Sequence, residues 1–459
     1  MRSKIFIGAL LATAVLLFNC GGDDVDPVPL LEGNLVLDSQ DAVNTAARLQ
    51  HTKITGSLII SDNADEGANP ITDLSGLSSI TCITGDLIVL ETAELTSLNG
   101  LESLEEIGGN LSITDNLNLR DIDGLRNVTR YSEPDIEISE NVRLISISGL
   151  QGITLANSLI VSSCNQLASL DGLQNLTGVS GDVFLGDNRG LTSLGGLSKL
   201  RYTRDLHLLG DNLQGLSGLQ ALDSVAGTLI ITYFNELTDL SDLSELSYVN
   251  SLRLTDNSSL TSTAGMTNLR TIDRKIEIRR NDGLLDLRGL ESATQCEEVT
   301  IDANENLSSL TGLNNLEQVL SLTLSSNPKL TDISALKSLH SIFNNFNLWN
   351  NNGLVSLEGL EGLALVDNFF ISNNPLLIDL SALQKLSTLS DLSLSDNTSL
   401  TTLDAFARVS QMDRFSARKN SSLSDFCGIA NIDIKVNYNV EENAFNPTEE
   451  DLLNGNCRN

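Results

Sequence analysis

Three histidines supply all the imidazole groups of this chain of 459 residues. His51, His207 and His340 lie far apart in the sequence, whereas catalytic side chains must converge within hydrogen-bond reach. The chain has no phosphate-binding glycine loop ending in Lys-Ser or Lys-Thr, no H-E-x-x-H and no C-x-x-C. His207, near Asp205, is the best acid–base candidate, and we interpret it as a solvated surface histidine. We therefore predict no catalytic residues and no enzymatic activity.

Four carboxylates occur one in each of four consecutive segments of similar length: Asp62, Glu91, Asp115 and Glu140. If these segments stack as successive coils, the carboxylates form a column with a spacing of about 4.8 Å. Like charges at that distance repel, and a hard divalent cation such as Ca²⁺ would relieve the repulsion. A calcium site is one interpretation and a solvated acidic edge is the other. Calcium is the one cofactor that the sequence suggests.

An exposed aromatic pair is the best candidate for binding a ligand. Trp349, the single tryptophan, and Phe370 are predicted to lie diagonally on neighbouring strands, among Asn345, Asn347 and Asn368. Aromatic faces beside amides can stack on sugar rings or anchor a protein contact. An incidental exposed aromatic is the alternative, since single apolar groups are normal on protein surfaces.

Charged residues at matching positions predict ion pairs between two neighbouring strands. Lys275 and Arg279 would face Glu298 and Asp302. We interpret these pairs as structural, because a surface ion pair contributes at most about 1 kcal/mol.

The elements that position these residues follow from a repeat of 23 or 24 residues. Clear copies are G-D-L-I-V at 85–89, G-N-L-S-I at 109–113 and G-T-L-I-I at 227–231. We number the first residue of each copy as offset 0. The sixteen copies start at 56, 85, 109, 134, 157, 181, 204, 227, 250, 274, 297, 320, 344, 367, 390 and 413. An earlier copy starts at residue 33.

The apolar pattern within a unit predicts one short strand followed by tight turns. Apolar residues occur at offsets 2 and 4, the period of a strand, and then at every third position from 10 to 22, which fits neither a strand nor an α-helix. Short extended or 3₁₀ segments around a narrow core fit this spacing. Strands of successive units would stack in parallel into a rod of roughly 70 Å.

Asparagine is the most frequent residue at offset 7, where the chain leaves the strand. An inward amide there can satisfy the N–H and C=O groups that the sheet no longer pairs. These residues are Asn63, Asn116, Asn141, Asn188, Asn257, Asn281, Asn304, Asn327, Asn351, Asn374, Asn397 and Asn420. Cys164 takes this position in one unit. A small residue at offset 15, as in Gly312, indicates a crowded corner.

The phrase G-x-L-x-I-x-x-N-x-x-L-x-x-L-x-G-L resembles the receptor L domain, a relative of the leucine-rich repeat, over about residues 33–423. The asparagine is followed by x-x-Leu, whereas ordinary leucine-rich repeats have x-Leu. The resemblance implies a right-handed solenoid used for recognition. We therefore predict a β-solenoid, an L-domain-like parallel β-helix of about 16–17 coils with short 3₁₀ segments and a capping helix at each end.

Both ends of the repeat array carry a predicted cap, which a solenoid needs to cover its terminal apolar faces. An amphipathic helix over residues 40–49 follows Ser39 in the N-terminal cap, 33–55. The solenoid spans 56–423, and the C-terminal cap, 424–459, has a strand over 432–436 and a helix that begins near Thr448. Because the caps remove exposed sheet edges, we expect a monomer.

The cysteines predict one disulfide in an exported protein. Cys427 and Cys457 bracket the C-terminal cap and are expected to pair. Cys82 and Cys296 are far apart along the rod and are expected to be free thiols in the core.

The first residues predict the cellular location. Residues 1–19 have two basic residues and an uncharged stretch too short to span a bilayer, as in a secretory signal. L-F-N-C at 17–20 resembles a lipobox, which implies that Cys20 becomes the acylated first residue. The alternative is an ordinary signal peptide with a chance cysteine. The acidic tether, 20–32, resembles the export signals of Bacteroidota lipoproteins, which implies exposure on the outer membrane.

Composition narrows the classes of partner. The chain has 28 Lys and Arg against 60 Asp and Glu, a net charge of -32, and such a surface repels nucleic acids and anionic lipid headgroups. Membrane contact is therefore expected through a lipid anchor only. We predict a non-enzymatic surface protein for recognition or adhesion, binding protein or polysaccharide through the sheet face. A structural envelope spacer without a ligand is the alternative, and a parallel β-helix enzyme acting on polysaccharide is a third.

Overall fold

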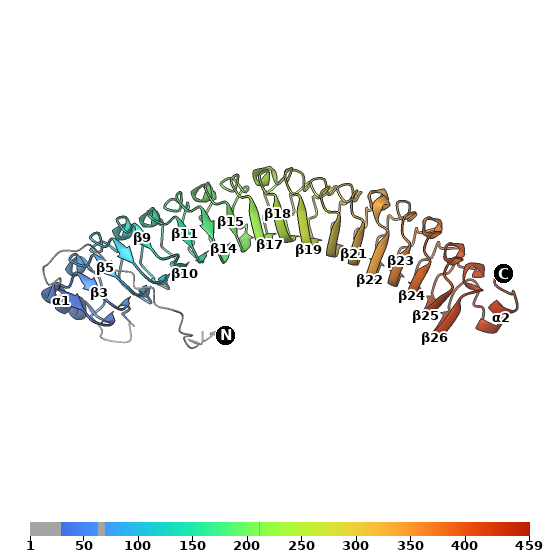
Figure 1. Cartoon of the computed structure of the whole chain (residues 1–459), viewed down its shortest axis with the longest axis horizontal. Helices are drawn as coiled ribbons and strands as arrows, with labels where there is room; N and C mark the ends of the chain where they lie inside the picture. The colour runs from blue at the N-terminus through green and yellow to red at the C-terminus, as the bar shows by residue number, and fades with distance from the viewer. Residues whose placement is uncertain (1–28, 63–68, 211) are drawn as a thin grey trace.

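The structure, a computed structural model, describes residues 29–62, 69–210 and 212–459. The chain forms a parallel β-solenoid in which each repeat makes one coil, and the coils stack side by side into an arch (Figure 1). Residues 1–28, which include Cys20 and the predicted signal segment, lie outside the described residues, as does Asn63. The fold class predicted from the repeat is confirmed, and the stack of coils curves into an arch.

The main sheet contains one strand from each coil, and within the described residues it has eighteen parallel strands. The strands of the first eight coils are β2 (Leu35–Leu37), β4 (Leu58–Ile60), β6 (Leu87–Leu90), β8 (Leu111–Thr114), β10 (Asp135–Ser139), β12 (Ser158–Ser162), β14 (Asp182–Gly186) and β16 (Asp205–Leu209). The longer strands that follow are β17 (Ser224–Thr232), β18 (Tyr248–Thr255), β19 (Thr271–Arg279), β20 (Gln295–Asp302), β21 (Gln318–Ser325), β22 (Ser341–Trp349), β23 (Leu365–Ser372), β24 (Thr388–Ser395), β25 (Gln411–Arg418) and β26 (Asp433–Glu441).

Short strands of two residues precede the main strands in the N-terminal half. β1 (Leu30–Leu31), β3 (Lys53–Ile54), β5 (Cys82–Ile83), β7 (Glu106–Ile107) and β9 (Arg130–Tyr131) form a second parallel sheet. β11 (Leu155–Ala156), β13 (Gly178–Val179) and β15 (Tyr202–Thr203) continue this side and pair onward to the beginning of β17. From β17 on, both pieces are joined in one strand.

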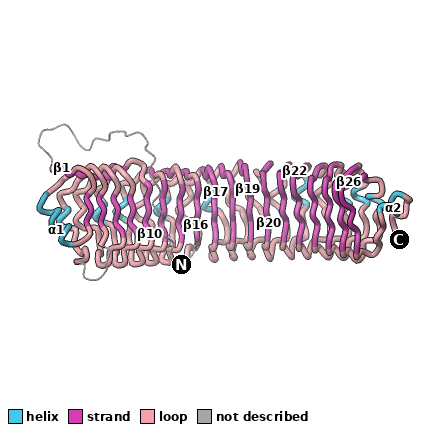
Figure 2. The backbone as a smooth tube through the Cα atoms, turned by 90° about the horizontal axis from the view of Figure 1, so that it is seen from below, coloured by secondary structure: helices cyan, strands magenta, loops and turns pink. Residues whose placement is uncertain are grey.

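The outer side of the arch is made of turns and 3₁₀ helices, and the main sheet lines its concave side (Figures 1 and 2). These 3₁₀ helices fall where the apolar spacing is three residues. They are η1 (Ser75–Leu77), η2 (Asp123–Leu125), η3 (Ser148–Leu150), η4 (Gly195–Leu197), η5 (Ser241–Leu243), η6 (Ser334–Ser338), η7 (Ser381–Leu383), η8 (Asp404–Phe406) and η9 (Cys427–Ile429). Pairing fixes the strand spacing at about 4.8 Å, and the bulkier turns opposite need more room, so the stack bends toward its sheet.

The core runs the length of the arch between the sheet and the turns. The seven apolar positions of the coil that begins at residue 320 are all buried, with 0–2% exposure. At offset 15, a Cβ on Gly312 would come into severe contact with the Leu287 carbonyl oxygen of the preceding coil, and the residue has a φ of 121°. Only glycine fits such a corner without displacing the neighbouring coil.

Each end of the solenoid has a short helix. α1 (Gln40–Leu49) begins after Ser39, whose side chain accepts a hydrogen bond from the Ala42 amide, and buries Val43 and Ala46. α2 (Glu449–Leu453) begins after Thr448, which forms a capping box with Asp451, and buries Leu452. The last strand, β26, is longer than the stretch 432–436 suggested, because it pairs with β25 as far as Glu441.

Candidate functional site

The concave face of the sheet, viewed in Figure 2, displays the residues at offsets 1, 3 and 5. Asn345, Asn347 and Trp349 lie on β22, and Asn368 and Phe370 lie on β23. Asn345 faces Asn368, and Asn347 faces Phe370 across the strand pair. Trp349 is 39% exposed, and Phe370 and the three asparagines are partly exposed. The structure therefore brings all five candidate residues onto one surface, which we call the Trp349 patch.

The backbone beneath this patch is firmly held. The Trp349 carbonyl accepts hydrogen bonds from the Ser326 amide, at 2.9 Å, and from the Asn351 side chain, at 3.0 Å. Directly behind the patch, the rings of Phe346 and Phe369 stack in the core with centroids 4.5 Å apart. A rigid aromatic and amide surface can bind a sugar ring or a protein side chain with little loss of conformational entropy.

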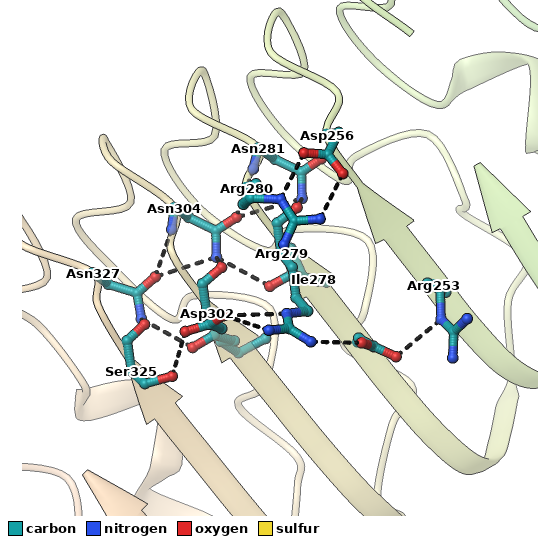
Figure 3. A network of polar contacts seen from close by, with 12 residues as sticks. Arg253, Asp256, Ile278, Arg279, Arg280, Asn281, Asp302, Asn304, Ser325 and Asn327 are labelled. Carbon is teal, nitrogen blue, oxygen red and sulfur yellow. Dashed lines mark hydrogen bonds and ion pairs between the residues drawn. The ribbon is translucent and has the colours of Figure 1, made fainter. Parts of the chain in front are cut away.

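An asparagine ladder borders the concave face where the chain leaves each strand. Each ladder side chain accepts a hydrogen bond from the backbone N–H of the preceding ladder residue and donates to a strand carbonyl of the preceding coil, as Asn304 does with Asn281 and Ile278 (Figure 3). The buried ladder residues are Asn116, Asn141, Asn188, Asn257, Asn281, Asn304, Asn327, Asn351, Asn374, Asn397 and Asn420. Asn443, which the sequence pattern missed, receives the amide of Asn420 and continues the ladder into the C-terminal cap.

A cluster of charges lies on β18, β19 and β20. Glu277 has a side chain that is only 10% exposed, and it pairs with Arg253 at 2.9 Å, Lys275 at 3.3 Å and Arg279 at 3.4 Å. Burial alone would raise the pKa of Glu277, but the neighbouring positive charges of Arg253 and Lys275 outweigh it and lower the pKa below the ordinary value. Glu277 is thus an ionised carboxylate at the centre of three cations.

The two ion pairs predicted across β19 and β20 are confirmed. Lys275 lies 3.4 Å from Glu298, and Arg279 lies 3.0 Å from Asp302. The central role of Glu277 was missed. Its place at offset 3, between Lys275 and Arg279 on the same strand face, was the available signal.

The predicted column of four carboxylates does not form. Asp62 is fully buried and accepts hydrogen bonds from the backbone amides of Ile71 and Ala93. Its carboxylate therefore satisfies turn amides inside the protein and is absent from the surface where Glu91, Asp115 and Glu140 are exposed. Within the described residues, no group of three acidic, histidine or cysteine side chains is placed to hold a metal ion.

The other three acidic residues of the predicted column share a left-handed backbone conformation. Glu91, Asp115 and Glu140 have φ values of 52°, 53° and 58°, in the left-handed region. The same conformation recurs just before the ladder position in later coils, including at Tyr233 and Arg280. Asp and Asn tolerate this region better than most residues. Offset 6 is thus a turn position, which side chains as different as Glu, Tyr and Arg occupy.

The histidines remain in separate coils. His51 follows α1, His207 lies on β16 and His340 precedes β22. His207 is partly exposed on the concave face, and its ring meets that of Phe184 edge-on with centroids 5.0 Å apart. Partial burial, and the charge of Arg253, lower the pKa of His207 below its ordinary value.

The cysteines differ in state. A disulfide joins Cys427 to Cys457 and ties η9 to the C-terminal segment. Cys82 is not a free thiol, so the expectation of one there is wrong. Cys164 and Cys296 are free and buried, and burial raises the pKa of their thiols to about 11 and about 12. Neither is a reactive nucleophile at neutral pH.

Among the described residues, none of the helices has the length and apolar character needed to cross a membrane.

Residues 51–151 match the receptor L domain family, which covers the coils from β3 to η3, less than a quarter of the chain. The chain thus contains a domain related to the leucine-rich repeat, a fold that generally serves as a scaffold for protein interactions and is typically non-enzymatic. A comparison with curated proteins found no significant match.

Solved structures of other proteins resemble the chain, and two of them cover most of its length. One is an internalin from Listeria monocytogenes, with 16% identity, a TM-score of 0.34, and coverage of 90% of this chain and 97% of the other. The second is a leucine-rich-repeat protein from Leptospira interrogans, with 16% identity, a TM-score of 0.32, and coverage of 91% and 96%.

Proposed function

We propose that this chain is a non-enzymatic recognition protein of the cell surface, whose concave sheet binds a protein or a polysaccharide. The observation that carries the proposal is the Trp349 patch on a rigid parallel sheet. Trp349 and Phe370 expose aromatic surface, and Asn345, Asn347 and Asn368 supply donors and acceptors around it. Large aromatic side chains with adjacent polar groups are frequent energetic centres of binding surfaces.

The test is a glycan array together with pull-down from surface extracts, using the wild type and Trp349→Ala. We expect a bound partner whose affinity falls at least about tenfold in the variant, as for a residue central to an interface. Ser393→Ala, at offset 3 of β24, is the matched control on the same face and should bind as the wild type does. The absence of any partner would favour an envelope spacer, and equal binding by Trp349→Ala would exclude this patch.

We also propose that the protein is anchored in the outer membrane through an acyl group on Cys20 and faces the outside. The support is the segment L-F-N-C at 17–20, followed by the acidic tether. Labelling of cells with a fatty acid should tag the wild type and not Cys20→Ala. Protease added to intact cells should degrade the wild type. Protection from protease would contradict the proposed surface exposure.

A further inference from the structure

The Trp349 patch is the centre of a larger uncharged area on the concave face. On three consecutive strands, β21, β22 and β23, the outward offsets 1, 3 and 5 carry side chains without a charge: Ser321, Thr323, Ser325, Asn345, Asn347, Trp349, Asn368, Phe370 and Ser372. We call this area the neutral panel. Ser325 is buried, and the others are partly or fully exposed. Strand spacing and residue rise give the panel a size of roughly 10 by 14 Å, enough for a short stretch of a linear polymer.

The charges that border the neutral panel are paired with one another. On the side of β20, Asp302 lies 3.0 Å from Arg279, and on the side of β24, Asp391 lies 2.9 Å from Arg414. These borders therefore leave no surplus of cations to attract an anion. The chain as a whole has a net charge of -32, which repels anionic polymers. The panel and its surroundings thus favour a ligand without charge.

The residue types of the neutral panel fit a sugar chain better than a protein. The panel contains no aliphatic side chain: offset 3 carries Ile160 and Ile230 in earlier coils, but Thr323 and Asn347 here. The core of a protein interface is mainly apolar, and serine is depleted in it. A neutral sugar chain presents hydroxyl groups, which both donate and accept hydrogen bonds, and apolar C–H faces. Amides and hydroxyls match the hydroxyl groups, and aromatic rings match the C–H faces.

Polar groups of the neutral panel are available to a ligand. Asn347 donates a hydrogen bond to the Thr323 hydroxyl at 3.1 Å, which orients its amide and leaves its side-chain oxygen as an acceptor. Within the part of the chain that the structure describes, the side chains of Ser321 and Asn345 have no hydrogen-bond partner. The amide of Asn345 therefore has both a donor and an acceptor to offer. Because these groups stand on a rigid sheet, ordering them on binding costs little entropy.

We propose that the neutral panel binds a linear, uncharged polysaccharide. One sugar ring stacks on Trp349 and another on Phe370, and the neighbouring asparagines form hydrogen bonds with hydroxyl groups of the chain. Trp349 and Phe370 are one strand and two residues apart, about 8 Å along the diagonal, so they contact different sugar units. The inference deepens the proposed function and rests on it, because it names the class of ligand for the same concave face.

The experiment uses the fluorescence of Trp349, which reports on this panel alone because the chain has a single tryptophan. The full chain is titrated with uncharged hexasaccharides of glucose, mannose, xylose and galactose in α and β linkage. We expect at least one of them to change the Trp349 emission, with the same affinity at low and at high salt, since no ion pair forms. Oligogalacturonate, a carboxylated chain, should bind more weakly.

Titration calorimetry measures the variants, including the one that lacks the tryptophan. Trp349→Ala should weaken binding at least about tenfold, as for a residue central to an interface. Asn345→Ala should weaken it about threefold to tenfold, the effect of one neutral hydrogen bond. Phe343→Ala is the matched control, because Phe343 is an exposed aromatic residue of β22 outside the panel. It should bind the glycan as the wild type does.

Three results would overturn the proposal: no uncharged glycan changes the Trp349 emission, oligogalacturonate binds more tightly than every uncharged glycan, or binding is unchanged in Trp349→Ala. A protein partner that is lost in Trp349→Ala, found together with no bound glycan, would overturn this inference and leave the proposed function intact. The absence of a partner of either kind would overturn both.

Discussion

The N-terminal and C-terminal halves of the arch are built from similar coils, but the hydrogen bonds that connect successive coils differ between them. From Asn257 to Asn443 the asparagine ladder is continuous, and Asn446 closes it by accepting the Asn443 amide at 2.9 Å. In the N-terminal half it is interrupted, because Thr92, Cys164 and Phe234 occupy three of the described ladder positions. The C-terminal half therefore has an unbroken chain of buried amides, and the N-terminal half does not.

The corner before the main strand shows a second difference. In the first coils, a polar side chain at offset 1 accepts a backbone amide of the next coil, as Asn34 does from Ser57 at 2.9 Å and Asp86 does from Asn110 at 2.7 Å. From β17 on, the corner lies within one continuous strand of eight or nine residues. Offset 1 is then free to carry outward groups such as Lys275. The backbone amides at the strand ends are hydrogen-bonded in both halves. Only in the C-terminal half is offset 1 left to widen the outward face of the sheet.

The largest expected effect comes from breaking the continuous ladder. Asn327→Ala removes the acceptor of the Asn304 amide and the donor to the carbonyls of Ile301 and Ser325, all in a buried setting. We expect a loss of about 3–5 kcal/mol in the free energy of unfolding, because buried polar groups lose their partners.

Urea unfolding measures this loss, with circular dichroism and fluorescence compared as probes because repeat proteins can unfold in parts. Asn188→Ala is the matched variant in the interrupted half. Among the described residues, the Asn188 side chain bonds the amide of Cys164 and the carbonyl of Val161, and for this variant we expect a loss of about 2 kcal/mol. Equal losses would show that continuity of the ladder adds nothing.

A smaller effect should come from placing an asparagine at one of the interrupted ladder positions. Cys164→Asn replaces a sulfur, a weak acceptor, with an amide oxygen at a fully buried ladder position. We expect a gain of about 1 kcal/mol in the free energy of unfolding, again measured in urea. Cys296→Ser, which changes a buried thiol outside the ladder, should give no gain. Destabilisation by Cys164→Asn would mean that the local backbone has adapted to cysteine.

The smallest effect concerns the charge cluster of the C-terminal half. Because the pKa of Glu277 is lowered by folding, its contribution to stability is present above its ordinary pKa of 4.5 and is lost as pH falls through the lowered value. Glu277→Gln should be less stable than the wild type at about pH 7, and the difference should shrink at about pH 3. Thermal unfolding at both pH values measures it. A difference independent of pH would show that the Glu277 charge is irrelevant.

Much of the fold was predictable because neighbouring coils repeat the same environment. The period, the inward leucines and the bounds of α1 follow from side-chain spacing, which depends on local geometry. Glu277 and Asp62 show where this reasoning fails. Glu277 is buried by three side chains from two strands, and Asp62 accepts an amide from the next coil. The residue spacing within one repeat predicts neither of these environments.

The sequence by itself determined that the chain stacks into a parallel solenoid with leucines inside and asparagines at the strand ends, because these positions recur with a fixed period. Only the tertiary structure decided the bend into an arch, since the bend arises from contacts between successive coils. It also decided that Asp62 faces inward and that Glu277 lies among cations. Burial and charge are properties of the stacked coils, and a single repeat does not contain them.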